Sequence, residues 1–555
     1  MIGFSCDGTP TRRKIMLAGP GTQGNAGQLK GITVMSTLSR RGFLNLVGKA
    51  GGVSAVYQTM AAMGLLSVPA AYAGPPSLPP GNGARVVILG AGIAGMVAAL
   101  ELGKAGYECR VLEARSRPGG RNWTLRGGDT VEEVDSTQRI AWEAADHLYF
   151  NPGPARLPHH HQGILGYCRE LGVPVEVMVN DNRAAWLHDD NAFGGMPQRA
   201  RAVINDQRGY VAELAAKAVD AAALGDPVSA EDREHLRAFL KAFGALDHDL
   251  AYRGSPRSGY VEPPGAATQS GTLHSPLDLR QLLRSEFWHG PTQFGEGFSQ
   301  AATMLQPVGG MGRIGDALGR RLGTIITYNA EVIALRRSGD DARVIWRDRA
   351  SGAEQTAEAP YVLCTIPFPV LSRLDTDFKP AVKLAIARLD YIPAAKVAFR
   401  AARRFWELDD QIYGGISWTN REITQMWYPS SGFHERQGII VGAYVWTAEI
   451  GEVFAASTPA RRLETALVSG ERVHPGYRDE VADGVSVAWS KIPFNRGAWA
   501  EWTRDGRQQA YALLLEPDGP FYFAGEHMSW IPGWQEGAVL SAHEAIVEIA
   551  KRVRK

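Results

Sequence analysis

The chain has 555 residues, 45% of them hydrophobic, which is enough apolar material for a large buried core and for two or three domains. Lys and Arg total 59 against 58 Asp and Glu, a net charge of +1, so the chain lacks the basic surplus typical of nucleic-acid-binding and membrane-surface proteins. Four widely separated cysteines without CxxC spacing argue against a disulfide framework or a zinc site and favour buried thiols: Cys6, Cys109, Cys168 and Cys364.

The first 73 residues are predicted to form an export leader. Arg40 and Arg41, followed by Gly42-Phe43-Leu44, resemble the arginine pair of a twin-arginine signal. A mildly apolar stretch begins at Val53, and Ala71-Tyr72-Ala73 has the small-x-small pattern that a signal peptidase cuts, so cleavage is expected after Ala73. These features predict residues 1–73 as a twin-arginine leader and a periplasmic or secreted location.

A transmembrane helix after a chance arginine pair is the alternative interpretation of this region. It is disfavoured because polar or helix-breaking residues interrupt an apolar run that is already short for a membrane span: Gln58, Thr59, Ser67 and Pro69. Met35 lies just before the arginine pair and is an alternative translation start, which would make residues 1–34 dispensable.

A nucleotide-binding unit is predicted to begin after a Pro- and Gly-rich linker. Arg85–Leu89 is an apolar, β-branched run typical of a buried parallel strand. Gly90–Gly95 closes that strand and opens a helix through about Lys104, and Tyr107–Leu112 is the next strand. This pattern predicts a Rossmann-type α/β domain whose first part is residues 84–160.

The middle of the chain alternates between helical and strand-like patterns. Residues 161–300 are mainly helical and polar, with Gly209–Leu224 and Ala230–Phe243 as the clearest segments, and are predicted to form a helical insertion. Residues 301–335 are predicted to return to the nucleotide-binding domain, and residues 336–485 to form mainly a substrate-binding domain. Four strand-like segments are predicted to build a mixed sheet that roofs a substrate cavity: Ala342–Arg347, Tyr361–Ile366, Ala395–Arg400 and Gly438–Val445.

Residues 486–555 are predicted to complete the nucleotide-binding domain. Phe521–Ala524 is a buried strand in this prediction, and a helix runs from Gly533 to Lys551. The apolar face of that helix is Val539, Ala542, Ile546 and Ile549.

A GxGxxG motif lies between the first strand and the first helix. Its glycines, Gly90, Gly92 and Gly95, allow a tight turn and the close approach of a pyrophosphate, whose charge lies at the helix N-terminus. Glu113, at the end of the second strand, is expected to accept hydrogen bonds from both hydroxyls of a ribose that carries no phosphate.

The segment Arg115-Ser116-Arg117-Pro118-Gly119-Gly120-Arg121 distinguishes FAD from NAD. A second glycine pair followed by arginine, directly after Glu113, suits an extended dinucleotide whose pyrophosphate the Arg121 guanidinium can clamp. NAD dehydrogenases lack such a segment, so FAD is the predicted cofactor.

With these motifs the chain resembles the flavin amine oxidase superfamily, which includes monoamine oxidases, polyamine oxidases, L-amino acid oxidases and L-amino acid 2-monooxygenases. The likeness runs from about Arg85 to Lys551 and includes Tyr522–Glu526 and Gly533–Ala538 near the C-terminus. It implies that Gly525 and Glu526 contact the pyrophosphate and ribityl region. It also implies that the last helix points its positive end at the flavin pyrimidine ring.

The resemblance implies cofactor-binding residues that are spread over the whole chain. They are Gly90, Gly92, Ile93, Ala94, Gly95, Glu113, Ala114, Arg115, Gly120, Arg121, Gly153, Pro154, Ala155, Arg156, Val332, Gly525, Glu526, Gly533 and Trp534. Gln306–Met311 looks like the Gly-Gly-Met segment that the family has near the flavin. Ala498 stands where monoamine oxidases carry the cysteine that is linked to flavin, which implies non-covalent FAD.

Three features favour amino acid substrates over simple amines: Arg156, Tyr444, and the aromatic set drawn from Trp489, Trp499 and Trp534. Gly153–Pro158 looks like the Gly-Pro-x-Arg-Leu-Pro segment of L-amino acid oxidases, in which the arginine, here Arg156, binds the substrate carboxylate bidentately. Tyr444 matches the family tyrosine that shares this carboxylate, although a core tyrosine on a strand would give the same pattern.

Aromatic residues and one lysine complete the catalytic set that the resemblance implies. Trp489, Trp499 and Trp534 fall in the family's substrate-facing segments and are predicted to surround the reacting carbon. Lys396 resembles the lysine that holds a water against flavin N5, and a cation there helps dioxygen accept electrons. The apolar neighbours of Lys396 predict that its side chain points inward.

The predicted activity is FAD-dependent oxidative deamination of L-amino acids to 2-oxo acids, ammonia and hydrogen peroxide, by hydride transfer from the α-carbon to flavin N5. An L-amino acid 2-monooxygenase, which would release an amide, and an amine oxidase remain the alternatives. The expected partners are an L-amino acid, dioxygen and the twin-arginine export machinery. Neither nucleic acid nor stable membrane insertion is expected, and a homodimer is left open.

No metal is assigned, because successive residues of His159-His160-His161 face alternate sides of an extended segment and solvation is the simpler interpretation. The helical insertion is expected to line the far end of the substrate pocket. No motif fixes which of its residues point inward, among them Asp247, Trp288 and Met304. Aromatic, aliphatic or basic amino acids are therefore expected as substrates, and their ranking is left open.

Overall fold

The computed structural model describes residues 72–220 and 229–553, and every structural statement below concerns these residues. The chain divides into two compact units, residues 1–73 and 74–555, and the features discussed below belong to the second. Apart from Tyr72 and Ala73, the predicted leader lies outside the described residues. Among the described helices, none combines the length and the apolar character that a membrane span requires.

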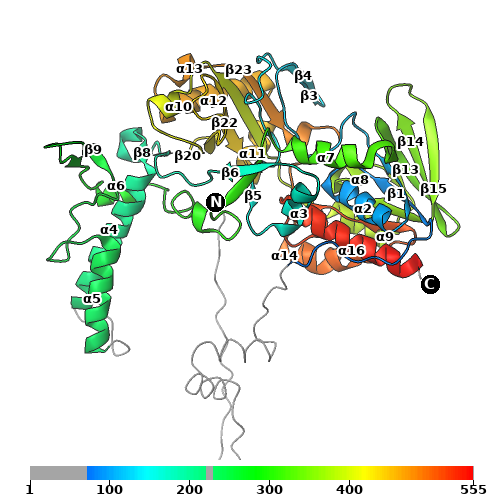
Figure 1. Cartoon of the computed structure of the whole chain (residues 1–555), viewed down its shortest axis with the longest axis horizontal. Coiled ribbons are helices and arrows are strands. Elements are labelled where there is room, and N and C mark those ends of the chain that lie inside the picture. Colours follow the sequence, from blue (N-terminus) through cyan, green and yellow to red (C-terminus); the bar gives the residue numbers. More distant parts are fainter. Residues whose placement is uncertain (1–71, 221–228, 554–555) are drawn as a thin grey trace, which may run out of the picture. The chain divides into compact units, whose positions relative to one another are not determined.

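A five-stranded parallel sheet lies toward the right of the second unit in Figure 1. In spatial order the strands are β12 (Ile326–Thr327), β2 (Glu108–Leu112), β1 (Arg85–Leu89), β16 (Tyr361–Cys364) and β25 (Phe521–Phe523). All four pairings are parallel, which confirms the Rossmann-type sheet predicted from the sequence.

The two faces of this sheet are both buried, and strand β1 shows the consequence for its sequence. Val86 and Ile88 join one core, whereas Val87 and Leu89 join a second core on the opposite face. A strand that is buried on both faces is apolar along its whole length, as this one is. Four helices contribute to the first core: α2 (Ile93–Lys104), α3 (Gln162–Glu170), α7 (Gly312–Leu322) and α16 (Gln535–Val553).

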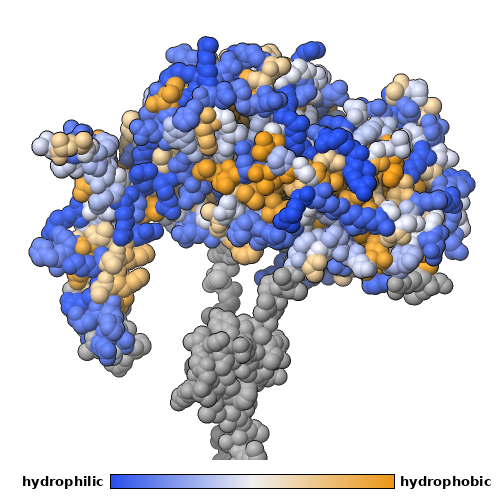
Figure 2. Space-filling view, viewed as in Figure 1, coloured by the Kyte–Doolittle hydropathy of each residue, from blue (hydrophilic) through white to orange (hydrophobic). Residues whose placement is uncertain are grey.

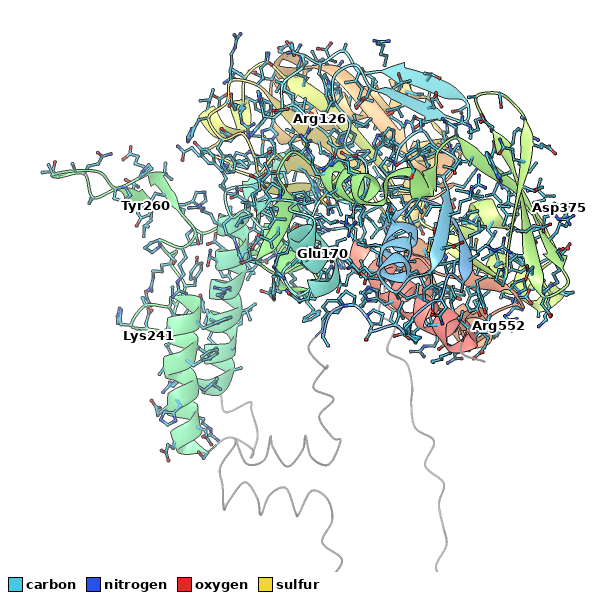
Figure 3. The ribbon with its side chains drawn as sticks, turned by 45° about the vertical axis from the view of Figure 1, so that its right-hand side comes forward. Arg126, Glu170, Lys241, Tyr260, Asp375 and Arg552 are labelled. Carbon is cyan, nitrogen blue, oxygen red and sulfur yellow. The ribbon has the colours of Figure 1, made fainter. Side chains whose placement is uncertain are left out.

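The opposite face of the parallel sheet is covered by a four-stranded sheet and two short helices. In order, its strands are β15 (Glu354–Ala359), β14 (Asp341–Asp348), β13 (Ala330–Ser338) and β17 (Asp375–Thr376), and the helices are α8 (Phe368–Leu371) and α9 (Pro380–Ala387). In Figure 3, Asp375 marks the four-stranded sheet and Arg552 marks the end of α16.

A seven-stranded mixed sheet forms the second large layer. In order, its strands are β23 (Val481–Ala488), β19 (Ala395–Ala401), β22 (Gly438–Val445), β21 (Gln425–Tyr428), β20 (Gly415–Thr419), β7 (Trp186–His188) and β8 (Gln198–Arg199). Its helices are α10 (Phe405–Leu408), α11 (Ala448–Ala456), α12 (Pro459–Val473) and α13 (Tyr477–Glu480).

Alternation along these strands determines which side chains share a face of the sheet. Ala395 and Val397 of β19 join the core that contains residues of α11 and α12, so Lys396 between them points to the other face. Trp427 and Tyr444 face away from that same core and pack against each other at a ring separation of 5.2 Å. The sheet therefore presents these three side chains on one face.

The region of residues 161–300 is only partly helical, so the predicted helical insertion needs correction. It contains the helices α3, α4 (Ala200–Asp220), α5 (Ala230–Gly244) and α6 (Leu279–Arg284), together with the strands β6 (Val175–Met178), β7, β8, β9 (Tyr260–Glu262) and β10 (Thr272–Leu273). These strands are two to four residues long, too short for their alternation to stand out in the sequence. Helix α4 also begins at Ala200 rather than at Gly209.

Helices α4 and α5 lie side by side and bury an alanine-rich seam between them (Figures 1 and 3). Figure 3 labels Lys241 on α5 and Tyr260 on the neighbouring β9–β10 hairpin. Apolar side chains remain exposed on this pair of helices, as Figure 2 shows: Val211, Leu214, Phe239 and Phe243.

The four strand-like segments predicted to roof the cavity do form strands, but they belong to three different sheets. Only β19 and β22 lie in the seven-stranded sheet, whereas β14 lies in the four-stranded sheet and β16 in the parallel sheet. The prediction that all four build one sheet was wrong, because strand alternation carries no information about which sheet a strand joins. Residues 336–364 accordingly belong with the nucleotide-binding side.

The remaining elements are short. The strands are β5 (Leu157–Pro158) and β11 (Met304–Pro307), which join β6 in a three-stranded sheet, and the pairs β3 (Thr130–Glu133) with β4 (Ser136–Arg139) and β18 (Asp390–Tyr391) with β24 (Ala500–Glu501). Short helical turns are α14 (Arg504–Gly506), Arg507–Tyr511, α15 (Ala512–Leu515), Phe193–Gly195, Phe294–Glu296, Gly323–Ile325, Trp489–Lys491 and Glu526–Met528.

Candidate functional site

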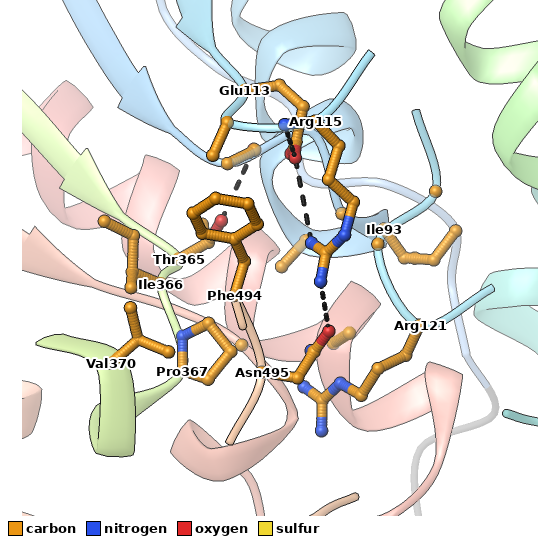
Figure 4. Close-up of a pocket in the computed structure, with 18 of the residues that line it drawn as sticks. Ile93, Glu113, Arg115, Arg121, Thr365, Ile366, Pro367, Val370, Phe494 and Asn495 are labelled. Atoms are coloured by element: carbon orange, nitrogen blue, oxygen red, sulfur yellow. Dashed lines mark hydrogen bonds and ion pairs between the residues drawn. The ribbon is translucent and has the colours of Figure 1, made fainter. Parts of the chain in front are cut away.

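A long cavity, here called the strand-end cavity, lies at the carboxyl ends of the parallel strands (Figure 4). It encloses about 1130 Å³ of space, including its opening to solvent. Most of the predicted cofactor-binding residues line it: Gly90, Gly92, Ile93, Ala94, Glu113, Ala114, Arg115, Gly120, Arg121, Val332, Gly525, Glu526, Gly533 and Trp534. In open α/β sheets, this edge is where ligands bind.

The Glu113 carboxylate is fixed at one end of this cavity by two backbone donors. The Ala91 N–H donates to Oε2 at 2.7 Å, and the Arg115 N–H donates to Oε1 at 2.9 Å. The side chain is 4% exposed and still lines the cavity, so its remaining lone pairs face the ligand space. A ribose diol is a suitable pair of donors for them.

The GxGxxG turn fits a dinucleotide for two separate steric reasons. A Cβ at Gly95 would overlap the Gly90 carbonyl oxygen, so this glycine lets α2 approach β1 and does not itself line the cavity. At Gly92, by contrast, a Cβ would meet nothing within 4 Å, because the position opens into the cavity. No side chain caps the N-terminus of α2 and its first turn carries no acidic residue, so its N–H groups suit a pyrophosphate.

Arg121 and Glu526 form a buried ion pair at the middle of the cavity. Arg121 Nη1 donates to Glu526 Oε1 and to the Ala498 carbonyl, both at 2.7 Å, and the Gly533 N–H donates to Glu526 Oε2 at 2.9 Å. Burial alone would raise the pKa of Glu526, but Arg121 and the Gly533 N–H outweigh it and lower that pKa below its ordinary value. Both residues line the cavity as charged groups that are already paired.

One wall of the strand-end cavity was not found from the sequence (Figure 4). It consists of Thr365, Ile366, Pro367, Val370 and Leu374 after β16, together with Phe494 and Asn495. Arg115 Nη2 donates to Asn495 Oδ1 at 2.5 Å, which ties this wall to the opposite one. The detectable signal was the strand of residues 361–364, because residues that follow a parallel strand gather at the same sheet edge.

A second cavity, here called the aromatic cavity, continues from the first. It encloses about 840 Å³ of space, including its opening, and shares Gly533, Trp534 and Gln535 with the strand-end cavity. Its aromatic lining is Phe294, Trp427, Tyr444, Trp446, Trp499 and Trp534, and its polar lining includes Arg156, Gln300, Lys396 and Gln425. Gly153–Arg156, predicted to contact the cofactor, line this second cavity rather than the first.

Arg156 enters the aromatic cavity among three rings. Its guanidinium carbon lies 4.7 Å from the Trp427 ring, 5.4 Å from Phe294 and 5.7 Å from Trp534. Burial lowers the pKa of this arginine to about 10, so it stays protonated at neutral pH. Among the described residues, no Asp or Glu lines the cavity or forms an ion pair with Arg156. The cavity therefore contains a partly buried cation that has no Asp or Glu partner in the described part of the chain.

Tyr444 and Lys396 are directly opposite each other on β22 and β19. Lys396 is 3% exposed, and its Nζ donates to the carbonyls of Gly153 at 2.7 Å and Asn151 at 3.0 Å. Nζ also lies 4.6 Å from the Tyr444 ring centre. Burial, with a smaller effect of the Arg156 charge, lowers the pKa of Lys396 to about 7. The prediction that this lysine points inward is confirmed.

Several predicted placements are wrong. Trp489 is 3% exposed and does not line the aromatic cavity, because it packs beneath Gly153 and its Nε1 donates to the Pro152 carbonyl at 2.8 Å. His161, predicted to be solvated with its neighbours, is 2% exposed and its ring lies edge-on to Trp534 at 5.0 Å. Periodicity could not reveal either contact, since both partners are distant in sequence.

The helical insertion contributes to the aromatic cavity through residues other than those considered. Asp247 pairs with Arg253, Trp288 is 48% exposed and Met304 is buried in β11, and none of the three lines the cavity. Phe294 and Gln300 line it instead. Gln306–Met311, predicted near the flavin, does not line the strand-end cavity; its Met311 N–H donates to the Asn151 side chain.

Comparison with known proteins agrees with this geometry. Residues 93–550 match the family described as flavin containing amine oxidoreductase. The flavin-dependent L-tryptophan oxidase RebO of Lentzea aerocolonigenes is 28% identical, over 83% of this chain and 97% of that protein. An L-amino-acid oxidase of Siganus canaliculatus is 26% identical, over 84% of this chain and 85% of that protein.

Solved structures with a similar fold are amine oxidases. Cyclohexylamine oxidase from Brevibacterium oxydans IH-35A superposes with a TM-score of 0.57 at 16% identity, over 86% of this chain and all of that one. Putrescine oxidase bound to putrescine superposes with a TM-score of 0.55 at 20% identity, over 84% of this chain and 99% of that one. At these identities the likeness shows the shared fold.

Proposed function

The chain belongs to the flavin-containing amine oxidoreductase family, and we propose that it is an FAD-dependent oxidase of L-amino acids. The observation that carries the proposal is the charge of Arg156 among aromatic rings, in a cavity that no Asp or Glu of the described residues lines. A substrate carboxylate supplies the missing anion, and a simple amine does not. Burying an unpaired cation is costly, so a cavity built this way favours an anionic ligand.

A flavin is the cofactor of this family, and the strand-end cavity has the features that FAD requires. Glu113 suits the ribose, and the uncapped α2 terminus beside Gly92 suits the pyrophosphate. The shared residues Gly533–Gln535 join the two cavities, so the flavin end of the cofactor can meet the substrate there. When bound, FAD supplies an acceptor for the α-hydrogen with its electron pair and passes two electrons to dioxygen.

The side chains of the aromatic cavity have separate proposed roles in binding the substrate, in excluding water and in the reduction of dioxygen. Arg156 and Tyr444 hold the two carboxylate oxygens, which fixes the orientation of the α-carbon. Trp499 and Trp534 confine the substrate and exclude water, and Lys396 supplies positive charge where dioxygen is reduced. The overall reaction converts the amino acid, dioxygen and water to a 2-oxo acid, ammonia and hydrogen peroxide.

The substrate side chain is expected to be uncharged. No Asp or Glu of the described chain lines the aromatic cavity, so a basic side chain would find no partner there. An acidic side chain would meet only Arg156, which binds the substrate carboxylate, and Lys396, which is assigned to dioxygen. The rings of Phe294, Trp427 and Trp446 offer apolar contact. We therefore expect aromatic and aliphatic L-amino acids to be better substrates than L-lysine or L-glutamate.

Anaerobic mixing of the purified holoenzyme with a panel of L-amino acids tests the proposal. Bleaching of the flavin by an amino acid, and not by its matching amine, is the expected result. Analysis of the products in air then separates an oxidase, which releases a 2-oxo acid, from a 2-monooxygenase, which releases an amide. Bleaching by phenethylamine or cadaverine as fast as by any amino acid would favour an amine oxidase instead.

The FAD is proposed to be non-covalent because Ala498, which lines the strand-end cavity, offers no nucleophile for a flavin linkage. Acid precipitation should release yellow flavin into the supernatant. Flavin that remains with the precipitated chain would show a covalent link elsewhere.

Export by the twin-arginine pathway is a separate proposal that rests on Arg40, Arg41 and Ala71–Ala73. Changing Arg40 and Arg41 together to lysine should retain the precursor in the cytoplasm. Sequencing the N-terminus of exported protein should find Gly74, and a start well upstream of Gly74 would contradict the cleavage site.

A further inference from the structure

Arg156 and two residues connected to it flank the strands of one small sheet. Arg156 directly precedes β5, Asn180 follows the end of β6, and Gln300 precedes β11, and these strands pair in the order β5-β11-β6. Met178 of β6 pairs antiparallel with Met304 of β11. That register brings the residues just after β6 beside those just before β11.

Two hydrogen bonds connect the three residues. Arg156 Nη1 donates to Asn180 Oδ1 at 3.2 Å, and Asn180 Nδ2 donates to the Gln300 carbonyl at 2.8 Å. The carbonyl can only accept and the guanidinium can only donate, so the two neighbours fix the orientation of the Asn180 amide. Asn180 itself is 5% exposed.

We propose that Asn180 determines substrate specificity: it holds the Arg156 guanidinium in place without neutralising it, so that only an anionic substrate completes the charge pair. The inference rests on the proposed role of Arg156 as the carboxylate clamp. Asn180 acts through Arg156 and is therefore a positioning residue. Its neutrality is as important as its hydrogen bond.

Other arginines of this protein show a guanidinium that is paired with a carboxylate. Arg121 pairs with Glu526, Arg404 with Glu407 and Arg462 with Glu133, so each has a glutamate carboxylate as partner. Arg156 has an asparagine amide where these have a carboxylate. Burial lowers the pKa of Arg156, whereas at Arg121 the opposing effect of Glu526 outweighs burial and the pKa is raised.

The substitution Asn180→Asp tests this directly, because it replaces the amide by a carboxylate of nearly the same shape. The new carboxylate would pair with Arg156 and occupy the place of the substrate anion. We expect the holoenzyme variant to bind benzoate, an unreactive carboxylate, at least 100-fold more weakly than wild type in a titration of the flavin absorbance. The flavin-to-protein absorbance ratio should match that of wild type, because Asn180 does not line the strand-end cavity.

Gln300→Glu is the matched control. It adds the same negative charge to the wall of the aromatic cavity, at a residue whose side chain makes no hydrogen bond to Arg156. Benzoate binding should weaken less than about tenfold in this variant. Equal losses in Asn180→Asp and Gln300→Glu would overturn the proposal, since cavity charge alone would then explain both.

Asn180→Ala and Asn180→Ser keep the proposal testable if the aspartate variant loses its flavin. Alanine removes the acceptor, so benzoate affinity and the KM for amino acids should worsen about tenfold while kcat changes little. Serine keeps an uncharged hydrogen-bond acceptor. The serine variant should therefore recover at least half of the lost benzoate affinity, measured on a logarithmic scale. No loss in Asn180→Ala, or no recovery in Asn180→Ser, would contradict the positioning role.

The two levels of inference fail in different ways. If wild type neither binds benzoate nor oxidises any L-amino acid, the proposed function is wrong. If wild type binds benzoate and Asn180→Asp binds it within threefold of wild type, the function stands and the role of Asn180 is wrong.

Discussion

The two cavities are built in opposite ways from the same chain. The strand-end cavity takes its charged and glycine residues from a few turns at the ends of β1, β2 and β25, and its ion pair, Arg121 with Glu526, is already complete. The aromatic cavity collects residues from β19, β21 and β22, the Gly153–Arg156 loop and the segment before β11. Its cation Arg156 has no Asp or Glu partner among the residues that the structure describes. Substitutions in the strand-end cavity should therefore weaken flavin binding, whereas substitutions in the aromatic cavity should impair the oxidation of the substrate.

Arg156→Ala is expected to have the largest effect. It removes one partner of a buried, bidentate charge pair, which should cost about 3–5 kcal/mol in kcat/KM for amino acids. Flavin content should be unchanged, because Arg156 lines only the aromatic cavity. Steady-state kinetics with an amino acid and its matching amine, together with the flavin-to-protein absorbance ratio, measure both effects.

Arg199→Ala is a suitable control for this change. Its guanidinium stacks 3.7 Å from the Trp186 ring centre and lines neither cavity, so its loss should leave kcat/KM within about twofold. Amino acid oxidation that survives Arg156→Ala within a few-fold would mean that the carboxylate binds elsewhere.

Glu113→Ala should show the reverse pattern. The carboxylate accepts hydrogen bonds from Ala91 and Arg115, and its loss should cost about 2–3 kcal/mol of flavin affinity, roughly a 30- to 150-fold weaker Kd. Reconstituted enzyme should retain nearly normal KM for amino acids. Titration of apoenzyme with FAD measures the affinity.

Glu108→Ala is the matched control on the same strand, because Glu108 is exposed at the start of β2. A change of KM rather than of flavin affinity in Glu113→Ala would contradict the assignment of the strand-end cavity to the cofactor and of the aromatic cavity to the substrate.

Lys396→Met should slow reoxidation of the reduced enzyme by roughly 30-fold, about 2 kcal/mol, and reduction much less, because the lysine is assigned to dioxygen. The lysine pKa, ordinarily 10.5 and lowered to about 7 by burial, makes the side chain charged below pH 7 and neutral above it. The wild-type reoxidation rate should therefore fall as pH rises through about 7. That dependence should vanish in the variant, as rapid mixing of photoreduced enzyme with dioxygen can measure.

Trp489→Phe should have the smallest kinetic effect. Trp489 lies behind the Gly153 loop, so kcat/KM should stay within about threefold. Loss of the hydrogen bond to the Pro152 carbonyl should lower the free energy of unfolding by about 1 kcal/mol. Thermal melting of the holoenzyme measures the stability, and a tenfold kinetic loss would mean that Trp489 acts within the substrate cavity.

The nucleotide-binding half was predictable because its information is local. The spacing of Gly90, Gly92 and Gly95 and the position of Glu113 at a strand end require only one βαβ unit to acquire their geometry. The inward orientation of Lys396 was predictable for a similar reason, since its apolar neighbours on one short strand report its environment.

What only the tertiary structure decided depends on contacts between distant segments. Strand alternation predicted β14 and β16 as strands but not the sheets they join, and a buried tryptophan such as Trp489 has the same local pattern whether it lines a cavity or packs behind it. The missing counter-charge of Arg156 and its contact with Asn180 depend on the pairing of β6 with β11, about 130 residues apart. The local sequence specifies which face of a strand a side chain lies on. The pairing of strands that are distant in sequence specifies which residues that face contacts.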